Sequence, residues 1–84
     1  MFSGIVEGMA VVKAIRKDKD NIDFTLTCPF VNELKEAQSL AHNGVCLTVT
    51  TINDTEYTTT AMRETLEKSN LGELKVGDQV NVER

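Results

Sequence analysis

The chain has 84 residues, a charged fraction of 26% and a formal net charge of −4 at pH 7. That length fits one domain with a single modest core. A weakly acidic surface argues against nucleic acid and against an anionic membrane as the primary partner. Apolar runs such as 9–12 are much shorter than a membrane span, and the N-terminus lacks the basic flank and long apolar stretch of a secretory signal. We therefore expect a cytoplasmic protein.

The first half of the chain reads as two strands followed by a helix. Residues 5–15 are rich in β-branched side chains, and residues 21–28 alternate between apolar and polar positions, so both ranges predict strands. Pro29 stops the second strand and suits the start of a helix. A short helix over 29–37 is predicted, because its apolar residues fall on a helical stripe. That stripe consists of Phe30, Leu34 and Ala37.

The middle of the chain predicts a tight hairpin. Residues 39–41 and 44–52 have strand-forming sequences and meet at a turn that contains Asn43 and Gly44. Asn-Gly is the pair that a type I′ hairpin turn prefers, because both residues tolerate a positive φ. The two strands are therefore expected to be antiparallel neighbours.

The last third predicts a strand, a helix and a final strand. Residues 55–62 favour a strand by propensity. Residues 63–72 favour a helix, because Glu64 precedes Lys68 by four residues and Gly72 can end the helix. A Gly-Asp turn then leads into the C-terminal strand. The whole pattern predicts an all-β fold, a small six-stranded antiparallel barrel with one or two short helices.

The two cysteines and the single histidine are too dispersed for a metal centre. Cys28 and Cys46 are too far apart for a C-x-x-C motif, and in a reducing compartment we expect free thiols. A zinc site needs four convergent ligands, usually in close pairs, which one histidine and two separate cysteines do not supply. No metal site is predicted.

A nucleophile–base pair is conceivable between Ser39 and His42, which are three residues apart. Positions i and i+3 of a strand point to opposite faces, so such a pair would need the chain to turn between them. The favoured interpretation of His42 is a turn residue in solvent. For Cys46 the favoured interpretation is a small half-buried strand residue, since no neighbouring residue obviously lowers its pKa.

Side-chain parity over residues 45–50 separates a core face from an outer face. One face carries Val45, Leu47 and Val49, which must point into the barrel. The other face carries Cys46, Thr48 and Thr50, which must point out of it. The favoured interpretation is the ordinary outer face of an exposed strand, and the alternative is a shallow external pocket in which the Thr48 hydroxyl and nearby amides bind a polar heterocycle. Composition leaves both interpretations open.

Four segments in register resemble one known family. They are "MFSGIVEG" at 1–8, "SLAHNGVCLTV" at 39–49, "ETL" at 64–66 and "NLGELKVGDQVNVER" at 70–84. In this order and spacing they resemble the N-terminal half of riboflavin synthase, and the resemblance covers the chain from end to end.

The resemblance implies a fold and a reaction. Riboflavin synthase consists of two similar six-stranded Greek-key barrels in tandem and a C-terminal helix, and it assembles as a homotrimer. It dismutates two molecules of 6,7-dimethyl-8-ribityllumazine to riboflavin and a ribitylamino-pyrimidinedione. Each barrel holds one lumazine, and the active site lies between the N-terminal barrel of one subunit and the C-terminal barrel of its neighbour. No metal or organic cofactor takes part.

The resemblance also implies which residues form the site. The lumazine ring is expected against the strand with Cys46, Leu47 and Thr48, and the opening strand supplies Gly4, Ile5 and Val6. The side toward the ribityl chain is closed by Ala61, Met62, Glu64 and Thr65. Phe2 and Ser39 line the space between barrels. Ser39 and Cys46 are the polar groups nearest the chemistry and are therefore the candidate catalytic residues.

Only the first of the family's two barrels is matched, which is typical of an excised N-terminal domain. Such a domain is expected to bind lumazine or riboflavin as a homodimer, with little or no turnover. Two other functions stay open: a non-catalytic flavin or lumazine carrier of the antenna type, and a plain interaction module that shares only the fold.

Overall fold

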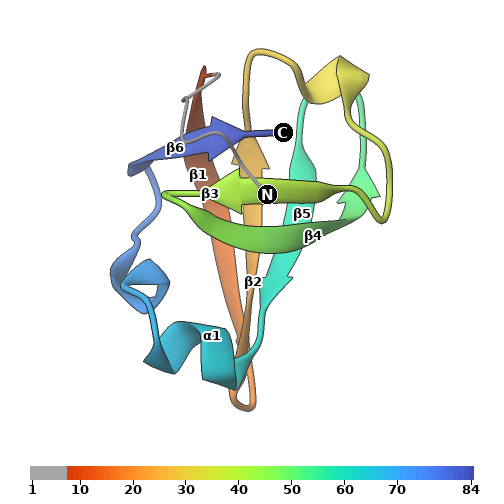
Figure 1. Cartoon of the computed structure of the whole chain (residues 1–84). Coiled ribbons are helices and arrows are strands. Elements are labelled where there is room, and N and C mark those ends of the chain that lie inside the picture. Colours follow the sequence, from red (N-terminus) through yellow and green to blue (C-terminus); the bar gives the residue numbers. More distant parts are fainter. Residues whose placement is uncertain (1–7) are drawn as a thin grey trace.

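The computed structural model describes residues 8–84, which fold into a closed antiparallel barrel of six strands (Figure 1). The strands follow one another around the barrel in the order β1-β2-β5-β4-β3-β6. Because β3, β4 and β5 are consecutive neighbours and β5 returns to lie beside β2, the topology is a Greek key, and the predicted fold class is confirmed. The elements are β1 (Gly8–Asp18), β2 (Asn21–Thr27), η1 (Val31–Glu33), β3 (Ser39–His42), β4 (Val45–Ile52), β5 (Tyr57–Ala61), α1 (Arg63–Glu67), η2 (Leu71–Glu73) and β6 (Gln79–Glu83).

Alternate residues of the strands fill the barrel. In β2 the side chains of Ile22, Phe24 and Leu26 are buried, whereas the residues between them are partly exposed. This is the period-2 pattern predicted from the sequence. Burial of these apolar side chains provides the main driving force for closing the sheet. The core also includes Ala10, Val12, Cys28, Phe30, Leu34, Leu40, Leu47, Val49, Tyr57, Ala61, Leu71, Val80 and Val82.

The turn between β3 and β4 has the predicted conformation. Asn43 and Gly44 have φ angles of 51° and 84°, and both are positive as a type I′ turn requires. This turn pairs His42 with Val45 and, further along, Ser39 with Thr48. The hairpin register is therefore fixed by the two residues that the sequence identified.

The prediction of a helix over residues 29–37 is wrong. Only the 3-10 turn η1 forms, and Leu34 after it is already extended, with φ −79° and ψ 156°. Phe30 and Leu34 are buried as expected, but Ala37 is exposed with a φ of 69°. The backbone amide of Ala37 donates to the Val49 carbonyl at 2.8 Å, so the end of this segment bonds to β4 and does not continue a helix.

The helix predicted over 63–72 is present but shorter. It ends at Glu67, and a separate 3-10 turn, Leu71–Glu73, follows. Gly72 therefore lies inside this turn and does not end the helix. The Ser69 hydroxyl donates to the Thr65 carbonyl at 2.7 Å and accepts from the Leu71 amide at 3.3 Å, so it bridges the two segments.

Within residues 8–84, no helix is both long enough and apolar enough to cross a membrane.

The interpretation of His42 as a solvent-exposed turn residue is wrong. His42 is the last residue of β3, on the core face, and only 2% of its surface is exposed. Its Nδ1 lies 3.0 Å from the Leu40 carbonyl and its Nε2 lies 2.9 Å from the Tyr57 hydroxyl. A carbonyl can only accept, so Nδ1 carries the proton and Tyr57 donates to Nε2. The neutral ring thus links two sides of the barrel inside the core.

We expect the stability of the barrel to fall as the pH drops from about 6.5 to about 4, the interval over which His42 titrates. Burial lowers the pKa of His42 from its ordinary 6.5 to about 4. Between these two pH values the histidine is protonated in the unfolded chain but neutral in the folded chain. The free energy of unfolding is therefore highest above pH 6.5 and falls as the pH is lowered through this interval. The loss attributable to His42 is about 3 kcal/mol. Urea denaturation at pH 7, 6, 5 and 4 measures it.

His42→Gln is the control, because carboxylates titrate in both proteins but only the wild type contains the imidazole. The wild type should lose more stability than H42Q between pH 6.5 and 4. Parallel stability curves for the two proteins would contradict the assignment.

Candidate functional site

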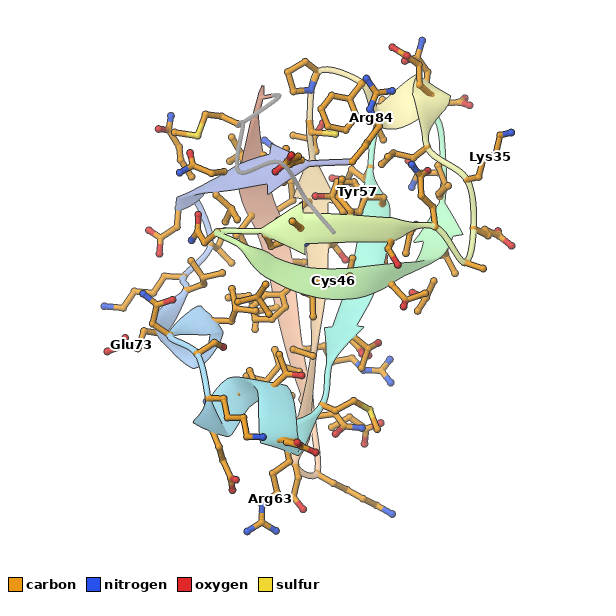
Figure 2. All side chains as sticks on the ribbon, viewed as in Figure 1. Lys35, Cys46, Tyr57, Arg63, Glu73 and Arg84 are labelled. Atoms are coloured by element: carbon orange, nitrogen blue, oxygen red, sulfur yellow. The ribbon has the colours of Figure 1, made fainter. Side chains whose placement is uncertain are left out.

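The outer surface of β3 and β4 carries the first group of predicted site residues. Cys46 and Thr48 are exposed on β4, and Ser39 lies directly opposite Thr48 on β3, so the three side chains share one face. Leu47 and Val49 point into the core. The predicted parity is therefore confirmed. Figure 2 labels Cys46 on β4.

The main chain of β4 offers polar groups beside this face. The Val49 amide donates to the Gln38 carbonyl at 2.9 Å, so Val49 directs its backbone toward the β3 side. Backbone direction alternates along a strand, and Cys46 and Thr48 therefore direct theirs toward β5. The β4–β5 ladder begins only at Val49, opposite Thr59. Thr48 stands at the end of that ladder, and Cys46, which pairs with Ala41 of β3, has no partner in the β4–β5 ladder.

A pocket of about 540 Å³ lies between the start of β4 and α1. It brings together three predicted site residues, Met62, Glu64 and Thr65, although they come from the connection after β5 and from the first turn of α1. Met62 is 58% exposed and presents a flexible apolar side chain to the opening. We call this the α1 pocket. Its lining is Val45, Met62, Glu64, Thr65, Lys68 and Ser69.

Charge and hydroxyl groups are arranged in pairs within the α1 pocket. Lys68 Nζ donates to Glu64 Oε1 at 2.9 Å, so the two opposite formal charges form an ion pair across one helical turn. The Ser69 hydroxyl donates to the Thr65 carbonyl at 2.7 Å, which holds the two residues together on one side of α1. The pocket therefore offers hydroxyl groups and one ion pair, and its formal charges sum to zero.

Several predicted residues cannot contribute a side chain to an external site, and others were missed. Leu47 and Ala61 are buried, so only their backbones can reach a ligand outside the barrel. The sequence analysis did not single out Val45, Lys68 or Ser69 as site residues. The spacing of Thr65, Lys68 and Ser69 on one helical face was the available signal. Phe2, Gly4, Ile5 and Val6 lie outside the described residues.

The described residues contain neither a Ser–His pair nor a metal cluster. Ser39 is exposed whereas His42 is buried on the opposite face of β3, as strand parity predicted. Between Gly8 and Arg84, no three His, Cys, Asp or Glu side chains come together to hold a metal ion. Both cysteines are free; Cys28 is buried and Cys46 is exposed. Burial also raises the pKa of the Cys28 thiol, so Cys28 is both less accessible and less ionised than a thiol in water.

A separate hollow of about 590 Å³ lies between the β1–β2 hairpin and η2. None of the predicted site residues lines it. Its lining is Ile15, Lys17, Ile22, Phe24, Gly72, Glu73, Leu74 and Lys75. We therefore place the candidate site at two neighbouring features. One is the part of β4 around Cys46 and Thr48, which we call the β4 edge, and the other is the α1 pocket.

The β4 edge and the α1 pocket are adjacent, because Val45 lines the pocket and Cys46 follows it in the same strand. The first has backbone groups of Cys46 without a partner in the β4–β5 ladder, and the second contains hydroxyls and the Glu64–Lys68 ion pair. Such a combination suits a planar polar heterocycle that carries a polyol chain.

Comparison with known proteins gives a consistent result. The chain is 45% identical over 86 residues to riboflavin synthase of Escherichia coli (strain K12) and 38% identical over 85 residues to riboflavin synthase of Bacillus amyloliquefaciens. Each alignment covers 100% of this chain and 40% of the relative, so the chain spans about two fifths of the length of these proteins.

Among solved structures, LumP complexed with 6,7-dimethyl-8-(1'-D-ribityl) lumazine has a TM-score of 0.92, and LumP complexed with flavin mononucleotide has 0.93. Both are 29% identical to this chain, and the match covers 99% of it and 48% of the LumP chain. The family described as lumazine binding domain matches residues 3–84. Because this match spans nearly the whole chain, the chain belongs to the lumazine binding domain family.

Proposed function

We propose that this chain is the N-terminal domain of a riboflavin synthase and binds 6,7-dimethyl-8-ribityllumazine or riboflavin as one half of the catalytic site. The observation that carries the proposal is that the β4–β5 ladder begins only at Val49, so that Cys46 has no ladder partner on its β5 side, directly beside the α1 pocket. The 45% identity to a riboflavin synthase supports the enzyme assignment. The free thiols of Cys28 and Cys46 favour a reducing, cytoplasmic compartment.

In the proposed complex the pyrimidine edge of the ring lies against the β4 backbone. The amide and carbonyl of Cys46 and the amide of Thr48 meet the ring's polar edge, with the Thr48 hydroxyl as a further partner. The ribityl chain enters the α1 pocket, where Glu64, Thr65 and Ser69 offer hydrogen bonds. Met62 flanks the ring. Gly4, Ile5 and Val6 are proposed to form the wall on the other side.

The proposed reaction needs orientation more than it needs a strong base. One lumazine loses a proton from a methyl group, and the resulting anion is delocalised over the ring. A four-carbon unit then passes from the other lumazine, giving riboflavin and the ribitylamino-pyrimidinedione. Holding two rings in register removes most of the entropic cost of bringing them together. Fixed backbone donors along β4 would stabilise the delocalised anion.

The second ring would be held by a second barrel that faces this one. In the whole enzyme, a homotrimer, that partner is the C-terminal barrel of a neighbouring subunit. Ser39 and Cys46 are the polar side chains that would face the second ring, since both lie on the outer surface of the β3–β4 hairpin. Phe2 would line the same space. This domain by itself would therefore bind ligand and turn over little.

A carrier function is the second candidate, because LumP complexes superpose on the chain with TM-scores of 0.92 and 0.93. A carrier needs one occupied barrel, whereas the enzyme needs two. Riboflavin formation from lumazine by the intact two-barrel protein would favour the enzyme, and binding without turnover would favour the carrier.

A fluorescence titration tests the proposed site. The wild-type chain should bind both riboflavin and the lumazine, and Thr48→Val should bind each about twofold to tenfold more weakly. Valine keeps the shape and strand preference of threonine but removes one hydroxyl hydrogen bond, worth about 0.5–1.5 kcal/mol. Thr50→Val is the matched control, because Thr50 shares the outer face but its hydroxyl donates to the Thr58 carbonyl. Equal losses in the two variants would remove Thr48 from the site.

The thiol of Cys46 provides a second test. A thiol reagent should modify Cys46 rapidly and buried Cys28 slowly in the folded chain. Saturating riboflavin should slow the reaction of Cys46, because the ring covers it, and should leave Cys28 unaffected. Mass spectrometry of the labelled peptides measures both rates.

The full-length Cys46→Ser enzyme should keep its turnover, since no covalent step uses the thiol. Unchanged labelling of Cys46 with bound flavin would contradict the proposed position of the ring. Loss of turnover with intact ligand binding would give the thiol a chemical role.

We expect this chain on its own to form a homodimer that binds one riboflavin or lumazine per chain. A second copy would cover the outer face that a neighbouring barrel covers in the two-barrel enzyme, and a two-fold pair is the simplest closed assembly. Light scattering with and without riboflavin measures the mass, and a riboflavin-formation assay measures turnover. A strict monomer that binds flavin would contradict the dimer, and turnover near that of the full enzyme would contradict the need for a second barrel.

A further inference from the structure

The charge pair in the α1 pocket suggests how the site selects among flavins, an inference that rests on the proposed function. We propose that Glu64 and Lys68 make the pocket selective for ligands whose ribityl chain ends in a neutral hydroxyl, and that Glu64 is the residue that disfavours a terminal phosphate. Flavin mononucleotide is thus expected to be the poorer ligand, and riboflavin the better one.

The pocket has no spare positive charge to offer a phosphate. Glu64 and Lys68 are its only charged lining residues among those described, and Lys68 Nζ is 2.9 Å from Glu64 Oε1. Glu64 precedes Lys68 by four residues, the order that favours such a pair on a helix. Hydroxyl groups of a ribityl chain can bond to Thr65, Ser69 and either charged group without disturbing the pair.

A phosphate in the same place would disturb the pair. A phosphomonoester carries a charge of about −1.5 to −2 at pH 7. To gain an ion pair it must draw Lys68 away from Glu64, and it then lies beside an unpaired carboxylate of like charge. Placing a like charge against the unwanted ligand is a general means of specificity. Because both side chains are largely exposed, with 78% and 74% of their surface accessible, we expect discrimination of about threefold to tenfold.

The barrel itself does not exclude a phosphate. LumP is described in complex with flavin mononucleotide, and that structure superposes on this chain with a TM-score of 0.93. Discrimination between the two flavins therefore has to come from side chains around the pocket and not from the backbone fold.

The same helix contains a matched control pair. Arg63 Nε donates to Glu67 Oε1 at 2.9 Å, also across four residues, and both side chains are exposed. Neither residue lines the α1 pocket. In Figure 2 Arg63 points away from the barrel. Glu67→Gln thus changes the net charge and breaks a helical ion pair as Glu64→Gln does, but outside the pocket.

The experiment measures the ratio of the dissociation constants for riboflavin and flavin mononucleotide. The wild type, E64Q, E67Q and K68Q are titrated with each flavin at low and at high salt, after circular dichroism has verified the fold. A ratio is used because any general weakening of the site affects both ligands equally.

We expect the wild type to prefer riboflavin and E64Q to shift the ratio toward flavin mononucleotide by about threefold to tenfold. E67Q should shift it by less than about twofold, and K68Q should shift it the other way. The E64Q effect should shrink at high salt, where exposed charges are screened.

A wild-type preference for flavin mononucleotide, or equal shifts in E64Q and E67Q, would overturn the inference alone. Failure of the wild type to bind either flavin would overturn the proposed function as well.

Discussion

The register of the β3–β4 hairpin is the constraint on which the site depends. Asn43 and Gly44 hold a two-residue turn with positive φ at both positions, and this turn pairs Ser39 with Thr48. A slip of one residue would turn Cys46 and Thr48 into the core and expose Leu47 and Val49. Core packing and the outer site are thus set by the same backbone geometry, so neither can be changed without the other.

The buried link between His42 and Tyr57 gives the hairpin a second anchor. Apolar packing alone is tolerant of small shifts, but a hydrogen bond of 2.9 Å inside the core has a narrow range of geometry. His42 is the last residue before the turn and Tyr57 is the first of β5, so the bond connects strands that are not neighbours in the barrel. The histidine that invited a catalytic interpretation in the sequence thus supports the site from the opposite side of the sheet.

Much of the fold could be predicted from local patterns, because strands are recognised by the alternation of apolar and polar side chains and tight turns by residues such as Asn-Gly that adopt a positive φ. The alternation in 21–28 and the Asn-Gly turn needed no tertiary information. The helix over 29–37 failed because an i, i+4 apolar pair is also compatible with a 3-10 turn that leads into an extended segment, and the Ala37–Val49 hydrogen bond that decides the matter is non-local. The burial of His42 involves a hydrogen bond to Tyr57, fifteen residues away, so it could not be predicted from the local sequence either.

For the candidate site too, local patterns predicted one part and long-range contacts determined the other. Parity placed Cys46 and Thr48 outside the barrel, but nothing local could bring Val45 beside Thr65 and Lys68, since the pocket exists only where α1 closes against the start of β4. The ladder to β5 begins at Val49, and the shortness of α1 leaves a hollow beneath the remaining edge. A fully paired sheet would have no backbone groups left for a ligand. The proposed site therefore depends on an incomplete ladder next to a short helix, while the core of the barrel stays closed.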